Sequence, residues 1–201
     1  MSEFEHSPWV PDGYKLGLYG RRIAIVGYSH HGRPKDEDHS EFTRDVLQKV
    51  IRGENIPGNF FSKIQRYFGE DKSFWEKVLF FNFLPNQIGA SDEKYKIGTK
   101  TDHERGRARF LKILLAEKPD CVFVFTTKGW SQCPKTTEEE NGPCIPLSDN
   151  ETGSWGTYDI SGHRVFAVGL LHPQYSNKAR MTKAIKEALA IHDIQFHVKK
   201  I

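Results

Sequence analysis

Four short runs of apolar residues are the clearest pattern along the chain. Each run is continuously apolar and does not alternate with polar positions. Continuous apolar character is typical of strands buried on both faces, as in a parallel sheet covered by helices, whereas half-exposed strands alternate. We therefore predict four strands of this kind, at Arg22–Gly27, Val78–Phe83, Cys121–Thr126 and Arg164–Leu171.

Apolar residues with helical spacing lie between these runs. Residues 42–51 place apolar side chains every three or four positions, and Gly53 follows where a helix C-terminal cap is expected. We predict a second helix that begins after Asn59, and a final helix over Lys178–His192. Strands and helices that alternate in this way are typical of α/β proteins.

The most regular helical pattern covers residues 101–118. Thr101 and Glu104 have the spacing of a capping box, and Pro119 marks the predicted end of the helix. One side of this helix is apolar. The opposite, polar side is expected to carry three basic residues, Arg105, Arg109 and Lys112.

The order of these elements predicts one architecture. We expect a three-layer α/β/α fold, in which helices cover both faces of a central, mainly parallel, four-stranded sheet. The chain has 201 residues and shows neither an internal repeat nor a linker-like segment, so we expect a single domain over residues 1–201. Prolines and glycines break the rhythm before the fourth strand, where residues 156–168 around Gly162 are predicted to form a hairpin.

Composition narrows the class of protein only slightly. Hydrophobic residues make up 37% of the chain, enough for a packed core, and no apolar run is long enough to cross a bilayer. The first residues lack the pattern of a secretory signal, so we expect a cytoplasmic monomer that does not associate with membranes. The three cysteines contain no C-x-x-C pair, which argues against a disulfide framework or a four-cysteine metal site and favours a reducing compartment.

The net charge of +3 is too small to indicate a nucleic-acid partner by itself, but the charge is unevenly distributed. Residues 94–118 hold eight Lys or Arg against three Asp or Glu, and residues 172–201 hold six against two. These two segments are the best suited to contact phosphate groups. A run of charge is equally typical of a solvated surface.

Polar residues follow three of the predicted strands: "GYSHHG" (27–32), Asn82 and "HPQYS" (172–176). Pro173 cannot donate a ladder hydrogen bond and favours an extended residue before it, so His172 is expected at the end of its strand. Ligands of α/β proteins bind beyond the carboxyl ends of parallel strands. We therefore expect one crevice to be lined by Ser29, His30, Asn82 and His172.

The order and spacing of these motifs resembles the uracil-DNA glycosylase superfamily over roughly residues 22–192. The segments "FFSKIQRYF" and "DKSFWEKVLFFNF" are also similar to a group of glycosylase-like proteins without an assigned activity. The resemblance implies an enzyme that excises uracil or a related deaminated or altered base from DNA, without a cofactor or a metal. A base removed in this way must first leave the helical stack and enter a pocket.

The resemblance also implies roles for individual residues. Asn82 would read the Watson–Crick edge of the flipped base, and His172 would stabilise the negative charge that develops on the base as the N-glycosidic bond breaks. Ser29 takes the position of the residue that activates water, and His30 is a second candidate for that role. Further base contacts are implied for Gly27 and Tyr28, and contacts to DNA for Tyr175, Lys178 and Arg180.

The first motif also supports an alternative without catalysis. Established active families commonly carry an aspartate, glutamate or asparagine in this motif, whereas this chain has Ser29 and His30. Serine is a poor general base. The alternative is a catalytically inactive protein with a glycosylase fold that binds nucleic acid or a protein partner.

Two further interpretations use some of the same residues. A serine esterase would combine Ser29 and His172 with an acid, either Asp120 or Asp159. A metal site would use three histidines, but no carboxylate or cysteine completes a tetrahedron at the usual spacing. Those histidines are His30, His31 and His39.

Overall fold

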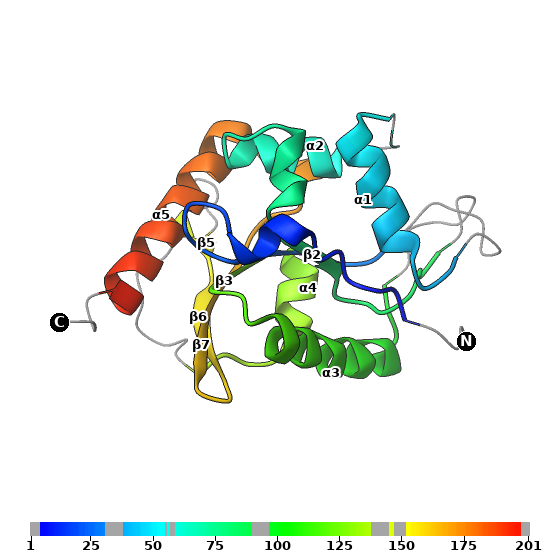
Figure 1. Ribbon diagram of the computed structural model, residues 1–201. Helices are drawn as coiled ribbons and strands as arrows, with labels where there is room; N and C mark the ends of the chain where they lie inside the picture. The colour runs from blue at the N-terminus through cyan, green and yellow to red at the C-terminus, as the bar shows by residue number, and fades with distance from the viewer. Residues whose placement is uncertain are drawn as a thin grey trace.

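A central sheet with helices above and below it organises the chain (Figure 1). The computed structural model describes residues 5–30, 38–54, 56, 59–89, 97–137, 145–146 and 152–197. Five strands lie in the order β2-β1-β3-β7-β6. Their bounds are β1 (Ile23–Gly27), β2 (Leu79–Asn82), β3 (Cys121–Val124), β6 (Trp155–Ile160) and β7 (His163–Gly169).

The sheet has five strands, so the prediction of four was wrong. The four predicted runs are β1, β2, β3 and β7, and these pair in parallel. β6 adds a fifth, antiparallel strand at the edge beside β7. β6 and β7 form the predicted hairpin, joined by Ser161 and Gly162, whose φ angles of 52° and 79° are those of a tight two-residue turn.

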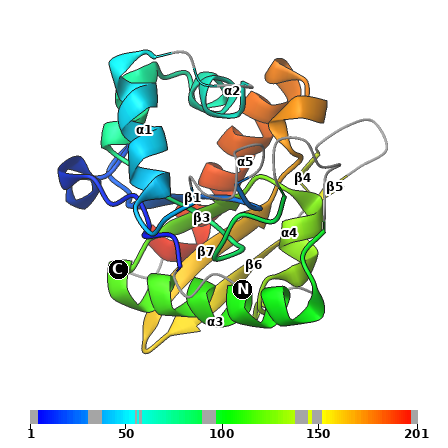
Figure 2. The same cartoon turned by 90° about the vertical axis from the view of Figure 1, so that its right-hand side faces the viewer.

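Helices cover both faces of the sheet, as a three-layer α/β/α fold requires. Figures 1 and 2 show α3 on one side of the sheet and α1, α2 and α5 on the other. The helices are α1 (Phe42–Arg52), α2 (Phe60–Tyr67), α3 (Lys100–Glu117), α4 (Thr127–Gln132) and α5 (Lys178–His197). Shorter elements are η1 (Asp12–Lys15), η3 (Lys72–Glu76), η4 (Pro173–Tyr175), β4 (Ile145–Pro146) and β5 (Thr152–Gly153).

Each face of the sheet has its own apolar core. Alternate residues of β1 point to opposite faces, so Ile25 joins the core under α1, α2 and α5, and Val26 joins the core under α3. Leu47, Ile64 and Met181 complete the first core from three different helices. The continuous apolar runs in the sequence follow directly from burial on both faces.

The helix ends follow the sequence with one correction. Gly53 ends α1 in the left-handed conformation, with φ 78°, as predicted, and α2 begins after Asn59. The capping box of α3 is formed by Thr99 and Asp102, not by Thr101 and Glu104. The Asp102 carboxylate accepts from the Thr99 N–H at 2.8 Å, and Thr99 Oγ1 accepts from the Asp102 N–H at 3.2 Å. The N-cap is therefore Thr99, two residues before the predicted cap at Thr101.

Arg109 was expected on the exposed side of α3, and that prediction was wrong. Its side chain is 5% exposed. Nη1 donates to the backbone carbonyl of Asn82 at 2.5 Å, Nη2 donates to the carbonyl of His6, and the guanidinium lies over the Phe81 ring at 5.5 Å from its centroid. Two carbonyls and an aromatic face replace water around this buried cation.

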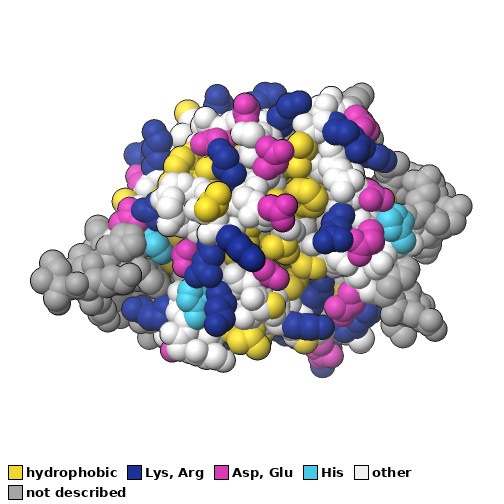
Figure 3. Space-filling model, viewed as in Figure 1, with side chains coloured by type: hydrophobic (Ala, Val, Ile, Leu, Met, Phe, Trp, Pro, Cys, Tyr) yellow, Lys and Arg dark blue, Asp and Glu magenta, His cyan; other side chains and the backbone are white. Residues whose placement is uncertain are grey.

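The surface seen in Figure 3 mixes Lys and Arg with Asp and Glu side chains and with apolar ones. This face carries no continuous basic stripe. Within the described residues, no helix combines the length and the apolar character that crossing a bilayer would need.

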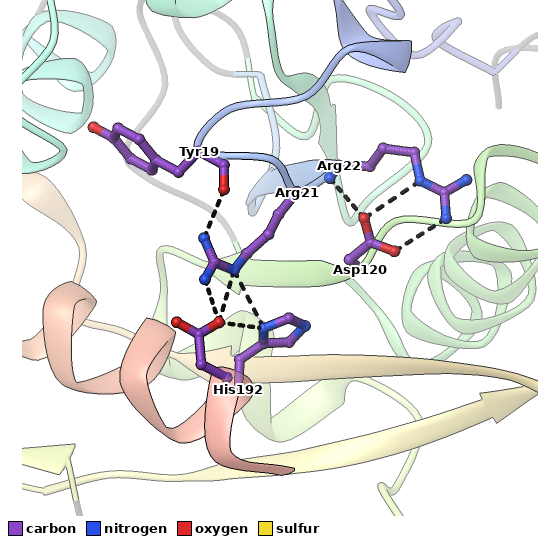
Figure 4. A network of polar contacts seen from close by, with 6 residues as sticks. Tyr19, Arg21, Arg22, Asp120 and His192 are labelled. Atoms are coloured by element: carbon purple, nitrogen blue, oxygen red, sulfur yellow. Dashed lines mark hydrogen bonds and ion pairs between the residues drawn. The ribbon is translucent and has the colours of Figure 1, made fainter. Parts of the chain in front are cut away.

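Two arginines before β1 join distant parts of the fold (Figure 4). Arg21 donates to the Tyr19 carbonyl at 2.8 Å and forms an ion pair with Asp193 of α5. Arg22 donates through its backbone and its guanidinium to Asp120, which precedes β3. These contacts hold the amino ends of β1 and β3. Asn82 lies at the opposite end of the sheet, where the parallel strands have their carboxyl ends.

Candidate functional site

A pocket of about 730 Å³ lies at the carboxyl ends of the parallel strands. Residues from separate parts of the chain meet there, as expected if ligands of α/β proteins bind beyond the carboxyl ends of parallel strands; this expectation is called the strand-end rule. Pockets of roughly 300–1,000 Å³ are typical of sites for small organic ligands. The sequence-predicted residues that line this pocket are Tyr28, Ser29, His30, Asn82, His172 and Tyr175.

Three other predicted residues are not among the lining residues. Gly27 lies at the end of β1, directly beside Asn82 in the ladder. Lys178 and Arg180 are exposed in the first turn of α5. Of the histidines considered for a metal, His31 lies outside the described residues.

Asn82 presents its amide at the end of β2. A Cβ at its ladder partner Gly27 would lie 2.2 Å from Asn82 Oδ1 and 3.4 Å from Phe60 Cζ, so glycine leaves the space that the amide occupies. Asn82 is 5% exposed, and the hydrogen bonds of the described residues use its backbone carbonyl but not its side chain. The amide therefore offers one acceptor and two donor hydrogens to a molecule in the pocket.

His172 is held with one ring nitrogen already engaged. Its Nδ1 accepts a hydrogen bond from the backbone N–H of Gln174 at 3.2 Å, and its ring lies 5.5 Å from that of Phe60. Burial and then the positive charge of Lys63 lower the pKa of His172. The ring is therefore neutral at physiological pH, and because Nδ1 accepts, the proton lies on Nε2, which is a donor.

His30 is enclosed by aromatic neighbours. Its Nε2 is 2.9 Å from Thr43 Oγ1, and its ring meets those of His6 and Phe42 edge-on, at centroid distances of 5.0 and 4.9 Å. Burial, and then the charges of His6 and Arg109, lower the pKa of His30 to about 3. A histidine with so low a pKa can hydrogen-bond to water but takes up a proton only weakly.

Ser29 is partly exposed in the pocket, beside His30. The described lining residues include no Asp or Glu, so no carboxylate among them is available to activate Ser29 or a water molecule. The two acids considered for an esterase lie elsewhere. Asp120 is bound to Arg22 at the amino end of β3, and Asp159 accepts from Gly162 in the hairpin turn. Neither of them lines the pocket, which argues against the esterase.

Tyr28 has a structural role as well as a place in the pocket. It is 6% exposed, and its hydroxyl is 2.8 Å from His103 Nε2 and accepts from the Gly98 N–H at 3.1 Å. These contacts join the turn after β1 to the start of α3. Only a small part of the ring is therefore available to a ligand.

Sequence reasoning missed several lining residues. Phe60 and Phe61 reach the pocket from α2, and Thr126, Thr127 and Lys128 follow β3. Thr126, Thr127 and Lys128 could have been found from the sequence, because β3 is parallel to β1 and β2 and its carboxyl end lies beside theirs. Nothing in the sequence marks Phe60 as a lining residue, since its apolar character is equally typical of a core position.

The described residues contain no group of three or more His, Cys, Asp or Glu side chains placed to hold a metal ion. Cys121 and Cys133 are buried free thiols. Burial raises the pKa of Cys133 to about 12, so its thiol is not activated as a nucleophile.

No protein-family model matches the chain, and no curated protein matches its sequence significantly. The likeness to uracil-DNA glycosylases therefore rests on the sequence motifs alone.

Proposed function

We propose that the pocket receives a base extruded from DNA and that the protein hydrolyses its N-glycosidic bond, with uracil or another deaminated base as the substrate. One observation carries this proposal. The amide of Asn82, which makes no hydrogen bond within the described part of the chain, and the neutral imidazole of His172 line the same pocket, with the Phe60 ring close to both.

The two polar groups suit the two demands of the reaction. An imide edge presents an N–H and a carbonyl oxygen, which the acceptor and donors of the Asn82 amide can pair with. As the bond to C1′ breaks, its electron pair moves onto the base, and the Nε2–H of His172 can donate to the carbonyl oxygen that becomes negative. A donor fixed in this way stabilises the transition state by about 3–4 kcal/mol in a site shielded from water.

Hydrolysis is completed by water, which adds its oxygen to C1′ and gives up one proton, and this proton neutralises the departed base anion. We assign Ser29 and His30 to hold this water. Neither is a strong base, because the pKa of His30 is lowered to about 3 and the described lining residues include no carboxylate. The mechanism therefore depends chiefly on departure of the base, which His172 assists, and only weakly on activation of water.

DNA contacts outside the pocket are part of the same proposal. Tyr175 is 79% exposed at the pocket rim, and Lys178 and Arg180 are exposed in the following helix. An exposed aromatic ring can stack on an unpaired base, and the two cations can contact phosphates.

The weak water-activating groups favour one second candidate, a protein that binds an altered base without releasing it. The two functions differ in a single measurement. A panel of labelled oligonucleotides, single- and double-stranded, carries one uracil, hypoxanthine or xanthine each. Release of the free base supports the enzyme, whereas base-dependent binding without release supports the binding protein.

Variants connect either outcome to the pocket. His172→Ala should reduce base release far more than it reduces DNA binding, and Asn82→Ala should reduce both. Lys186→Met, at an exposed position of α5 outside the pocket lining, is the control for a substitution that leaves the pocket intact. If the oligonucleotides are not bound at low salt, both functions are wrong, and if His172→Ala releases the base at the rate of the wild type, the mechanism is wrong.

A further inference from the structure

One face of α2 is turned toward the segment that carries His172. Phe60, Lys63 and Tyr67 are spaced by three and four residues and therefore lie on the same side of the helix. Phe60 meets the ring of His172, and the other two reach the backbone of the next residue, Pro173.

The Pro173 carbonyl is the point at which this helix holds the segment. Lys63 Nζ donates to it at 2.9 Å, and the Tyr67 hydroxyl lies 3.3 Å from it. The Ser176 hydroxyl is 3.3 Å from the same oxygen and 2.8 Å from that of Tyr67. Pro173 is buried, and three protein groups donate to this oxygen.

We propose that Lys63 is a positioning residue for His172, which fixes the imidazole through the Pro173 carbonyl and disfavours a second positive charge beside it. This inference rests on the proposed function, because it explains how the Nε2–H donor is kept in place and in the correct tautomer. Lys63 itself does not line the pocket and is not a catalytic residue.

The charges around His172 are consistent with this role. Lys63 of α2 donates to the next residue, Pro173, while Lys128 of α4, His30 and Tyr175 line the same pocket as His172. The described residues that line the pocket include no Asp or Glu. Burial lowers the pKa of His172 most, and the positive charge of Lys63 lowers it further. In the neutral ring, Nδ1 accepts from the N–H of Gln174. Protonation of His172 would put a hydrogen on Nδ1, so two N–H groups would face each other and this hydrogen bond would be lost.

Substitutions at Lys63 separate the hydrogen bond from the charge. Lys63→Met removes both, Lys63→Gln keeps a donor without the charge, and Lys63→Arg keeps both. The imidazole of His172 is followed by nitrogen NMR in ¹⁵N-histidine-labelled protein, with His172→Ala to assign the signal. Arg66→Met, at an exposed position of the same helix, is the matched control.

We expect the pKa of His172 to rise in Lys63→Met and Lys63→Gln and to stay at the wild-type value in Lys63→Arg and Arg66→Met. The acid limb of the pH profile for base release should shift to higher pH in the same two variants, because the neutral ring is then lost earlier. In Lys63→Met the tautomer signal should also change toward a mixture, since the Pro173 carbonyl keeps the two longer hydrogen bonds of Tyr67 and Ser176 but loses its shortest one.

The inference is wrong if His172 titrates identically in the wild type and in folded Lys63→Gln, or if Lys63→Arg behaves like Lys63→Met. Circular dichroism establishes that each variant is folded, and Lys63→Gln is the conservative replacement if Lys63→Met does not fold. The NMR titration does not require activity. A shift in the pKa of His172 in a protein that releases no base would contradict the enzymatic function and support the role of Lys63.

Discussion

Gly27→Ala tests the geometry of the site with a single methyl group. The new Cβ would lie 2.2 Å from Asn82 Oδ1, whereas real contacts of a Cβ are essentially never shorter than 3.0 Å. The backbone of β1 is paired on both sides, with β2 and with β3, so it resists displacement. The amide of Asn82 must therefore move by about 1 Å.

The cost can be divided into activity and stability. A displacement of about 1 Å at a group that orients the substrate reduces the rate about 100-fold, which corresponds to about 2.7 kcal/mol of transition-state stabilisation. An extra methyl group in a packed region destabilises the fold by about 1–3 kcal/mol. The first is measured as kcat/KM for the best substrate of the oligonucleotide panel, or as Kd if the base is bound and not released. The second is measured by unfolding in urea.

Gly156→Ala is the matched control. A Cβ at Gly156 would lie 2.1 Å from Thr136 Oγ1 and 2.4 Å from Thr136 Cβ, so it displaces a whole side chain, but in β6 and away from the pocket lining. Gly156→Ala should lose at least as much stability as Gly27→Ala, and only Gly27→Ala should lose activity. Activity of Gly27→Ala within about threefold of the wild type would refute the proposal that the Asn82 amide holds the base.

Three further substitutions probe the frame of the site. Arg109→Met leaves two buried carbonyls without a donor and should lower the free energy of unfolding in urea by about 2–4 kcal/mol, and a loss below about 1 kcal/mol would contradict this. Phe60→Leu should weaken binding of the base by about 1 kcal/mol in an equilibrium titration, and unchanged affinity would remove Phe60 from the site. Burial raises the pKa of Asp120, but hydrogen bonds from Arg22 outweigh it and the pKa falls below its usual 3.8. Stability from this pair is present above that value and is lost as the pH falls through the folded pKa. Thermal unfolding from about pH 5 to pH 2 should thus show a steeper loss in the wild type than in Asp120→Asn, and equal slopes would contradict the ion pair.

The parallel strands were predictable because burial on both faces leaves a mark in the sequence itself. Ile25 and Val26 point to opposite faces, and both are apolar since a helical layer covers each face. The strand-end rule then brought Asn82 and His172 to one pocket without any knowledge of their distance. β6 was not among the four predicted strands, because Gly156, Thr157 and Asp159 interrupt its apolar pattern. The sequence indicated this segment only as part of a hairpin.

Arg109 and Lys63 could not be predicted, for a different reason. Their partners are backbone carbonyls, at Asn82 and His6 for one and at Pro173 for the other. Every residue has a carbonyl, so the sequence contains no sign of which one will lack a partner after folding. Helical spacing therefore placed Arg109 on the polar side of α3, while the folded chain brings two carbonyls to it.

The outer edge of β2 has a bearing on how this protein is produced. Trp9 closes that edge, because its N–H and carbonyl pair with Phe80 at 2.8 and 3.0 Å. A ribosome delivers Trp9 some seventy residues before its partner strand. Trp9 is therefore already available when β2 leaves the ribosome, and its pairing closes an edge ladder that another nascent copy could otherwise join.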